Sequence, residues 1–298
     1  MTAIGEIGLS EGNKAKAIKA FVHLNYNFGA RNWNKNYENG TLLGINDPFA
    51  YGYHRAADFG FHVNYSEDKP ENKIEKLFRL MIRYFLKFDF VHAWRNRKGI
   101  FDADVVWTHT ESQCLAVLLL FWLSQPNPRP KLIAQTVWVF DRWWKFWAPN
   151  RWLCTKLLAQ ADLLTVLSPE NLKVARQLLP QVRSELVLYG ARAEEKIPPR
   201  LEAFHNPIRI ISLGNDEHRD WATLIQAVRN WKACELRIAS SKVSPRLVAG
   251  ARNIEIVRAR SNREFLHLYD WADLAVVALK PNMHGNCSPY FGVMGAAN

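Results

Sequence analysis

A glycine, an arginine and an aspartate meet at one strand-to-helix turn in the segment ISLGNDEHRDWATLIQA (211–227). We expect a buried strand to end at Gly214 and an amphipathic helix to begin near Trp221, with Asp220 as its N-cap. Arg219 stands just before this helix, where a guanidinium and free backbone N–H groups can share an anionic ligand. The segment therefore indicates phosphate binding, with an ordinary turn carrying solvated charges as the alternative.

A second glycine-punctuated loop, HGNCSPYFGVMGAAN (284–298), runs into what the sequence predicts to be the first turn of a helix. Its stretch from Ser288 to Gly292 can offer backbone N–H groups to a phosphate. The chain stops inside this predicted helix. We expect a truncated C-terminal end, because a native terminus more often follows a finished element, and a small domain with a frayed tail is the alternative.

Two candidates lie in the first half of the chain. The stretch YNFGARNW (26–33) follows the first predicted strand and puts Gly29 and Arg31 in its turn, where a glycine lets backbone approach a ligand closely. His109 stands at the carboxyl end of the predicted strand in VVWTHTE (105–111), pointing toward the presumed cleft. A plain strand–helix turn and a structural histidine are the respective alternatives.

Alternating short apolar runs and helical patterns must position these residues. Strands are predicted at 20–26, 59–65, 104–109, 131–137, 162–168 and 184–190, and again at 208–214, 234–240, 253–259 and 273–279. This alternation predicts an α/β protein with two doubly wound, Rossmann-like domains. We assign them to residues 1–195 and 208–298, the second incomplete, joined by a polar, proline-rich linker at 196–207. The cleft between the domains, at the carboxyl ends of the strands, is the expected site.

Composition narrows the class of protein. With 298 residues, 48% of them hydrophobic, the chain can build two cores, and its N-terminus lacks a signal-peptide pattern. The longest apolar run (115–123) is roughly half of what spans a bilayer and predicts a buried helix. The four cysteines form no CxxC pair, which favours reduced thiols in a cytoplasmic protein and no zinc site.

The net charge of +11 calls for an anionic partner: a nucleic acid, a membrane face or a phosphorylated ligand. A nucleic acid fits poorly, because the sequence contains no RRM, OB or helix-turn-helix pattern.

Two segments could instead bind an anionic membrane surface. The stretch 72–88 is a basic amphipathic helix, with Arg79 or Arg83 and Lys87 among its cations. Its alternative is that the apolar side, with Leu77, Met81, Phe85 and Phe88, packs on the sheet. The stretch 138–152 interleaves tryptophans with cations. Its candidate surface residues are Arg142, Trp143, Trp144, Lys145 and Trp147.

The overall layout resembles the retaining GT-B glycosyltransferases of the GT4 type. The second domain of that family opens with a strand, a Gly-Arg pair, and a Lys-Gly before an xxLIxA helix, and GNDEHRDWATLIQA (214–227) occupies this place. The run NIEIVRARSNREFLHLYDWADLAVVAL (253–279) is similar to the family's NVxFxGxxxxxELxxLYxxADxxVxPS. The resemblance covers most of the chain and is strongest from Ala161 onward.

The resemblance implies donor contacts near Gly214. Arg219 matches the family's pyrophosphate-binding Lys with its charge kept, whereas Asn215 replaces the family's Arg. The family's Glu-x7-Glu motif falls on Asn286 and Met294, of which only Asn286 can hydrogen-bond a sugar hydroxyl. The other donor contacts implied on this loop are Ser288, Tyr290, Phe291 and Gly292.

The family's roles extend to the first domain and to the reaction. Gly29 and Arg31 would face the acceptor, and His109 would contact the transferred sugar. The implied activity moves a sugar from a nucleotide-diphosphate donor to a lipid-linked or polysaccharide acceptor, with retention and without a metal or other cofactor, in a cytoplasmic protein peripheral on the inner face of the plasma membrane. The alternative is a catalytically disabled or truncated GT-B relative that acts as a membrane-surface binding module.

Overall fold

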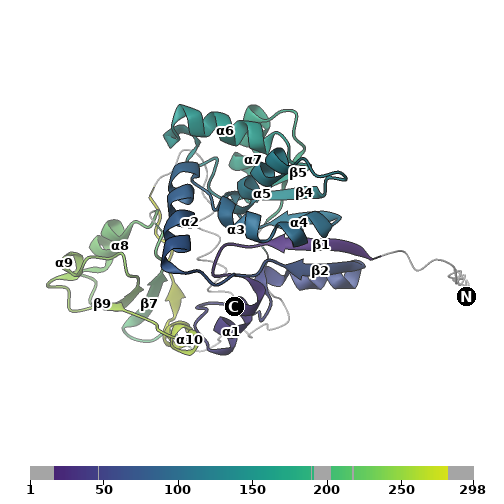
Figure 1. Ribbon diagram of the computed structural model, residues 1–298. Coiled ribbons are helices and arrows are strands. Elements are labelled where there is room, and N and C mark those ends of the chain that lie inside the picture. Colours follow the sequence, from purple (N-terminus) through teal and green to yellow (C-terminus); the bar gives the residue numbers. More distant parts are fainter. Residues whose placement is uncertain (1–16, 46, 189, 191–202, 217, 281–298) are drawn as a thin grey trace, which may run out of the picture.

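The computed structural model contains two separate parallel sheets (Figure 1), and it describes residues 17–45, 47–188, 190, 203–216 and 218–280. The larger sheet has six strands in the order β2-β1-β3-β4-β5-β6, and the smaller has four in the order β10-β7-β8-β9. Every strand pair is parallel, as the alternation of strands and helices predicted. The prediction of an α/β fold with two doubly wound sheets is confirmed.

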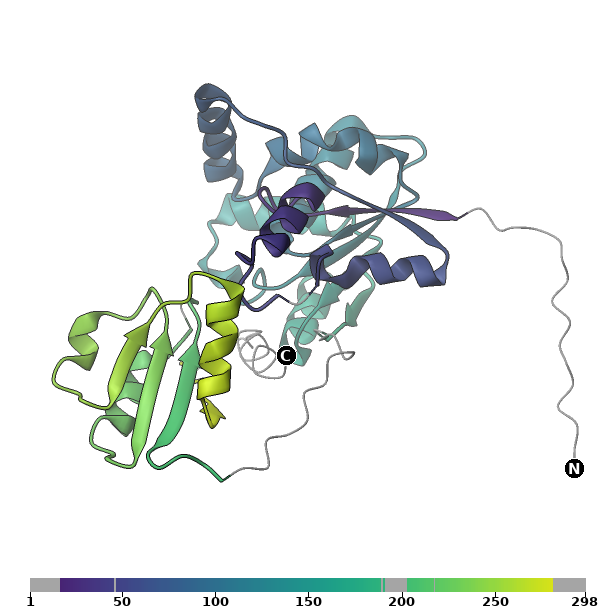
Figure 2. The ribbon, with the colours of Figure 1, turned by 90° about the horizontal axis from the view of Figure 1, so that it is seen from below.

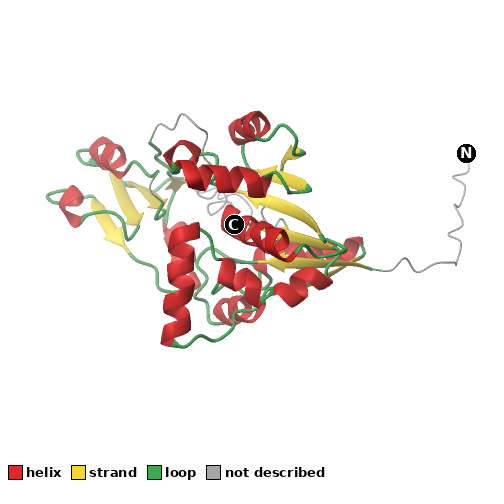
Figure 3. Cartoon of the chain, turned by 45° about the horizontal axis from the view of Figure 1, so that its top comes forward, coloured by secondary structure: helices red, strands yellow, loops and turns green. Residues whose placement is uncertain are grey.

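The elements of the larger sheet follow the predicted apolar runs. Its strands are β1 (Ile18–His23), β2 (Phe61–Tyr65), β3 (Val105–Thr108), β4 (Lys131–Thr136), β5 (Leu163–Val166) and β6 (Ser184–Leu186). Its helices are α1 (Ala30–Glu38), α2 (Lys73–Leu86), α3 (Phe90–Arg95), α4 (Arg97–Asp102), α5 (Glu111–Ser124), α6 (Ala148–Leu158) and α7 (Pro169–Leu178), with the 3-10 turns η1 (Ala50–Phe59) and η2 (Trp143–Lys145). Figure 3 shows helices on both faces of this sheet.

Local chemistry accounts for the best-defined of these helices. Ser168 caps α7 by accepting a hydrogen bond from the backbone N–H of Asn171, and Pro169 stands in the first turn. The helix α5 is apolar on all sides and lies in the centre of the core, as predicted for its run of leucines. Of the described helices, none combines the length and the hydrophobicity that crossing a bilayer requires.

The smaller sheet contains β7 (Ile208–Leu213), β8 (Cys234–Ala239), β9 (Ile254–Val257) and β10 (Leu274–Ala275). Its helices are α8 (Trp221–Val228), α9 (Pro245–Val248) and α10 (Asn262–Trp271). Asp220 caps α8 by accepting hydrogen bonds from the backbone N–H and the hydroxyl of Thr223, as the sequence predicted.

Each sheet has one point where the order of its strands reverses. In the larger sheet this point is β1, which lies between β2 and β3, and in the smaller sheet it is β7, which lies between β10 and β8. At such a point the loops on the two sides diverge and leave a crevice at the carboxyl ends of the strands. The loops after β1 and β7 are therefore where this fold would receive a ligand.

The two sheets meet through α10, which lies on the side of the smaller sheet that faces the larger unit (Figure 2). The Asn262 backbone N–H donates to the Gly40 carbonyl oxygen at 2.6 Å, and the Asn262 side-chain oxygen accepts from the Gly44 N–H at 2.8 Å. These bonds join the N-terminus of α10 to the chain after α1. They hold one wall of the cleft between the sheets.

Candidate functional site

A cavity of about 710 Å3 lies between the two sheets, at the carboxyl ends of the smaller one. The loops after β7, β8 and β9 form one side of it, and the chain after α1 contributes to the other. The residues used below that line it are Gly214, Asn215, Asp216, Arg219, Ser240, Ser241, Arg258, Arg260 and Tyr269. Its position is the one predicted for the ligand.

Arg219 is the buried cation of this cavity, with 5% of its surface exposed. Its Nε donates to an Asp216 carboxylate oxygen at 2.7 Å. Its Nη1 is buried and has no hydrogen-bond partner in the described part of the chain. A buried charged donor without an acceptor is costly. The arrangement favours an external anion that accepts from Nη1.

Gly214 makes room for this guanidinium. Its φ of +143° lies in the region that only glycine adopts readily, and a Cβ built here would come within 2.6 Å of the Arg219 Nε. The loop after β7 therefore depends on glycine for its backbone conformation and for the position of its arginine.

Asn215 links two loops at the edge of the cavity. Its side-chain oxygen accepts hydrogen bonds from the Ser240 hydroxyl at 3.1 Å and from the Ser241 N–H at 2.7 Å. This leaves the amide N–H groups of Asn215 as the donors that can contact a ligand. Asn215 thus supplies hydrogen bonds, but no charge, at the position where the resembling family has an arginine.

The chain after β10 returns to the same loop. The Asp220 N–H donates to the Ala278 carbonyl oxygen at 3.0 Å, and the Lys280 N–H donates to the His218 carbonyl oxygen at 2.8 Å. Residues 281–298 follow directly. They lie outside the described residues, and with them the predicted donor contacts Asn286, Ser288, Tyr290, Phe291 and Gly292 and the motif position Met294.

Sequence reasoning missed several residues of the cavity. Arg258 and Arg260 follow the carboxyl end of β9, the same placement that singled out Arg219. Tyr269 lies on α10, where burial raises the pKa of its hydroxyl to about 12 while the nearby Arg219 works in the opposite direction. The rule that ligands bind after strand ends, applied to β9, could have found both arginines.

The glycine loop after β1 is filled from within the chain. The Asp68 carboxylate accepts hydrogen bonds from the Asn27 N–H at 2.9 Å, the Gly29 N–H at 3.0 Å and the Asn32 side-chain amide at 2.7 Å. A Cβ on Gly29 would come within 2.8 Å of the Asp68 backbone nitrogen. The close approach that required a glycine is made by this protein segment and not by a ligand.

Arg31 lies on the surface, where its Nε is 3.5 Å from a Glu67 carboxylate oxygen and its side chain is 90% exposed. Neither Gly29 nor Arg31 is among the described residues that line the cavity. The structure therefore gives no contact between this loop and the cleft, and the acceptor role of the two residues stays a prediction.

His109 is enclosed and does not line the cavity. Its ring stacks on Tyr51 with centroids 3.5 Å apart, and its Nδ1 is 3.3 Å from the Tyr53 hydroxyl oxygen. Burial lowers the pKa of His109 to about 4, so the imidazole is neutral at pH 7. Both tyrosines belong to η1, which covers the carboxyl end of β3. A contact between His109 and a transferred sugar stays a prediction that requires η1 to move.

Two of the predicted membrane-surface residues are buried, and these predictions are wrong. Arg79 is 4% exposed because its guanidinium pairs with Glu71 and Asp89, and Trp143 is 4% exposed because it packs into the main core. The remaining predicted residues are exposed: Arg83, Lys87, Arg142, Trp144, Lys145 and Trp147.

The alternative for the helix at 72–88, in which its apolar side packs on the sheet, is also wrong. Leu77, Met81 and Phe85 are exposed, and Phe88, past the end of α2, is the one buried residue of the predicted apolar side.

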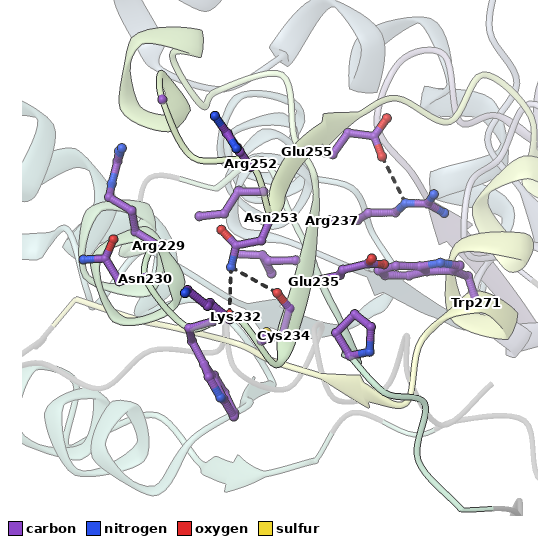
Figure 4. A pocket seen from close by; sticks show the side chains of 15 residues that line it. Arg229, Asn230, Lys232, Cys234, Glu235, Arg237, Arg252, Asn253, Glu255 and Trp271 are labelled. Atoms are coloured by element: carbon purple, nitrogen blue, oxygen red, sulfur yellow. Dashed lines mark hydrogen bonds and ion pairs between the residues drawn. The ribbon is translucent and has the colours of Figure 1, made fainter.

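A larger cavity, of about 930 Å3, lies at the amino ends of β8 and β9 (Figure 4). Several of its polar groups are joined to one another or to nearby backbone. The Asn253 amide donates to the carbonyl oxygens of Val228, Trp231 and Cys234. Arg237 pairs with Glu255 at 3.1 Å (Figure 4). Ligands of such folds bind at the carboxyl ends of the strands, and this cavity lies at their amino ends. It is therefore the weaker candidate for a ligand site.

Comparisons with known proteins identify the fold. No family model matches the chain, and no curated protein matches it in sequence. Among solved structures, it is similar to sucrose-phosphate synthase from Thermosynechococcus elongatus, with 12% identity and a TM-score of 0.56 over 90% of this chain and 77% of that one. HepE from Anabaena, solved in complex with UDP and glucose, matches with 10% identity and a TM-score of 0.50 over 88% and 75%. The chain therefore has the GT-B fold of these glycosyltransferases.

Proposed function

We propose that the protein is a glycosyltransferase that takes a sugar from a nucleotide-diphosphate donor. The observation that carries this proposal is the Arg219 Nη1, which is buried in the cleft without a partner in the described part of the chain. The GT-B fold supports it, and so does the UDP bound in the structure of HepE. A diphosphate supplies both the charge and the acceptor oxygens that this guanidinium requires.

In the proposed complex the donor diphosphate lies against the loop after β7. Arg219 donates to a phosphate oxygen from Nη1, and Asn215 donates from its side-chain amide. Arg258 and Arg260 add positive charge at the end of β9. The stretch Ser288–Gly292 would offer backbone N–H groups to the same diphosphate.

The reaction would break the bond between the sugar's anomeric carbon and the diphosphate oxygen, and it would form a bond from that carbon to an acceptor oxygen. Negative charge develops on the leaving diphosphate, and a positioned guanidinium stabilises it more as the bond breaks. The acceptor hydroxyl gives up its proton in the same reaction, to the departing diphosphate oxygen or to solvent. We propose retention of anomeric configuration and no metal requirement.

The proposed acceptor is a lipid-linked sugar or a polysaccharide at the inner face of the plasma membrane. The net charge of +11 suits an anionic acceptor or surface. The exposed Trp144 and Trp147 and the exposed apolar face of α2 suit contact with a membrane.

A second candidate is a catalytically disabled GT-B relative that binds membrane surfaces. Asn215 stands where the resembling family has a cation, and Tyr51 covers His109. Both observations favour loss of transfer activity while the exposed apolar helix is kept.

The test uses the protein as it is, with UDP- and GDP-sugars assayed for transfer and hydrolysis, and with UDP and GDP titrated by calorimetry. The proposal predicts binding of at least one nucleotide in the micromolar range, about −8 kcal/mol. Binding without turnover would support the disabled relative. Absence of both nucleotide binding and turnover would overturn the proposal that the protein is a glycosyltransferase.

A further inference from the structure

The helix α2 carries its apolar side outward. Ile74, Leu77 and Phe85 are 79%, 70% and 68% exposed, and Phe78, Leu80, Met81 and Tyr84 are exposed beside them. In Figure 2 the helix stands out from the body of the larger unit. An amphipathic helix of a globular protein normally packs the apolar side on its core. Here the apolar side is left for something outside the chain.

The orientation of α2 is set by its one buried charge. The Arg79 Nε donates to Glu71 at 2.7 Å, and its Nη1 donates to Asp89 at 2.6 Å. The guanidinium also lies 4.0 Å over the Tyr26 ring. Rotating the helix to bury Leu77 and Phe85 would pull Arg79 away from two buried carboxylates and leave them unpaired, which is costly. The outward apolar face is therefore a feature of the folded chain.

The N-terminal end of the helix is also fixed. Asn72 and Glu75 form a reciprocal capping box, with hydrogen bonds of 2.9 and 3.1 Å. Arg95 of α3 pairs with Glu71, which places a second arginine on the carboxylate that holds Arg79. The helix can thus present its apolar face to a partner without first having to fold.

The charges around the apolar face select the partner. Lys73, Lys76, Arg83 and Lys87 are exposed, whereas the acidic Glu75 is engaged in the capping box. A second copy of the chain would bring the same cations against one another, which disfavours dimerisation through this face. A bilayer rich in anionic lipid satisfies both the apolar residues and the cations.

We propose that α2 lies in the interface of an anionic phospholipid bilayer, with Leu77, Met81 and Phe85 below the headgroups and the lysines and arginines at their level. The helix follows the carboxyl end of β2, the same end of the sheet that faces the cleft (Figure 1). Binding here would hold the cleft close to the membrane. This consequence rests on the proposed function, whereas the binding itself does not.

The test is sedimentation with sucrose-loaded vesicles of phosphatidylcholine, with and without about one-third phosphatidylglycerol, and without nucleotide. The protein should pellet with the anionic vesicles at low salt and be released as salt rises. The double substitution Leu77→Ser and Phe85→Ser should lower the partition coefficient at least about tenfold. Lys76→Gln with Arg83→Gln should reduce the preference for anionic vesicles.

The matched control is Leu123→Ser with Phe59→Ser, which removes side chains that are 61% and 81% exposed, outside α2. This control should bind vesicles like the unchanged protein, and all variants should keep the same thermal midpoint. Equal binding of the Leu77/Phe85 variant and the control would overturn the proposal. So would a concentration-dependent dimer in sedimentation velocity that the Leu77/Phe85 substitutions abolish. Nucleotide titration of the same variants tests the glycosyltransferase separately.

Discussion

The loops after β1 and β7 have the same place in the fold, since each lies where the order of the strands reverses. They differ in whether their hydrogen-bond donors already have an anionic partner. After β1, the backbone N–H groups of Asn27 and Gly29 already donate to the carboxylate of Asp68. After β7, the Arg219 guanidinium has one nitrogen paired with Asp216 and another buried without a partner in the described part of the chain. The first loop has its anion built in, and the second still requires one.

This difference shows that a crevice position alone does not define a ligand site. Both loops contain a glycine that allows a close approach, but at Gly29 the approaching atoms belong to Asp68, and at Gly214 they belong to Arg219. A carboxylate satisfies donors and closes a site, whereas a partly paired cation leaves it open.

The largest effect is expected from removing the internal anion of the first loop. Asp68→Ala leaves two backbone N–H groups without their acceptor, so it should lower the free energy of unfolding by about 3 kcal/mol in urea denaturation. Asp68→Asn, which keeps an acceptor oxygen, should cost less. If Asp68→Ala were as stable as the unchanged protein, the first loop would not depend on its internal carboxylate.

The next effect concerns His109, which follows β3, the strand paired with β1. Its pKa of about 4 in the folded protein lies below the usual histidine value of 6.5, so the unfolded chain binds the proton more tightly. Its contribution to stability is complete above pH 6.5 and declines as pH falls toward 4, reaching a loss of about 2 kcal/mol at pH 5.

His109→Gln should flatten this part of the pH profile of unfolding while other titrating groups still act in both proteins. The measurement is urea denaturation of both proteins at pH 7 and pH 5. Identical pH profiles would show that the imidazole is not enclosed by Tyr51.

The smallest effects come from a matched pair of glycine substitutions. Gly214→Ala should displace the Arg219 guanidinium and lower nucleotide affinity about tenfold. Gly29→Ala should lower the free energy of unfolding by roughly 1–2 kcal/mol and leave nucleotide affinity unchanged. Calorimetry and thermal denaturation of both variants check the pair. A fall in nucleotide affinity in Gly29→Ala alone would reverse the assignment of the open loop.

The fold was predictable because its signals are local. Buried parallel strands appear as apolar runs, and the ends of α7 and α8 are marked by Ser168 and Asp220. The Gly214–Arg219 loop was predictable for the same reason, since all its parts lie within six residues of sequence.

The sequence was misleading where a residue's surroundings depend on partners that are distant in the chain. The anion that fills the Gly29 loop comes from a residue 39 positions away. Arg79 is buried because its guanidinium donates hydrogen bonds to two carboxylates, those of Glu71 and of Asp89, which lies ten positions later in the chain. The helical periodicity of the sequence identifies the apolar side of α2. It does not show whether that side faces the core or the solvent, because the buried ion pairs of Arg79 decide the orientation of the helix.

The central claim is that the diphosphate of a nucleotide binds at the loop after β7 and not at the loop after β1. It is tested by titrating UDP and GDP into Arg219→Gln and Asp68→Asn by calorimetry. Losing a charged hydrogen bond predicts a 20- to 100-fold weaker affinity for Arg219→Gln, roughly 2–3 kcal/mol. Asp68→Asn should bind like the unchanged protein. Unchanged affinity in Arg219→Gln together with altered affinity in Asp68→Asn would contradict the account.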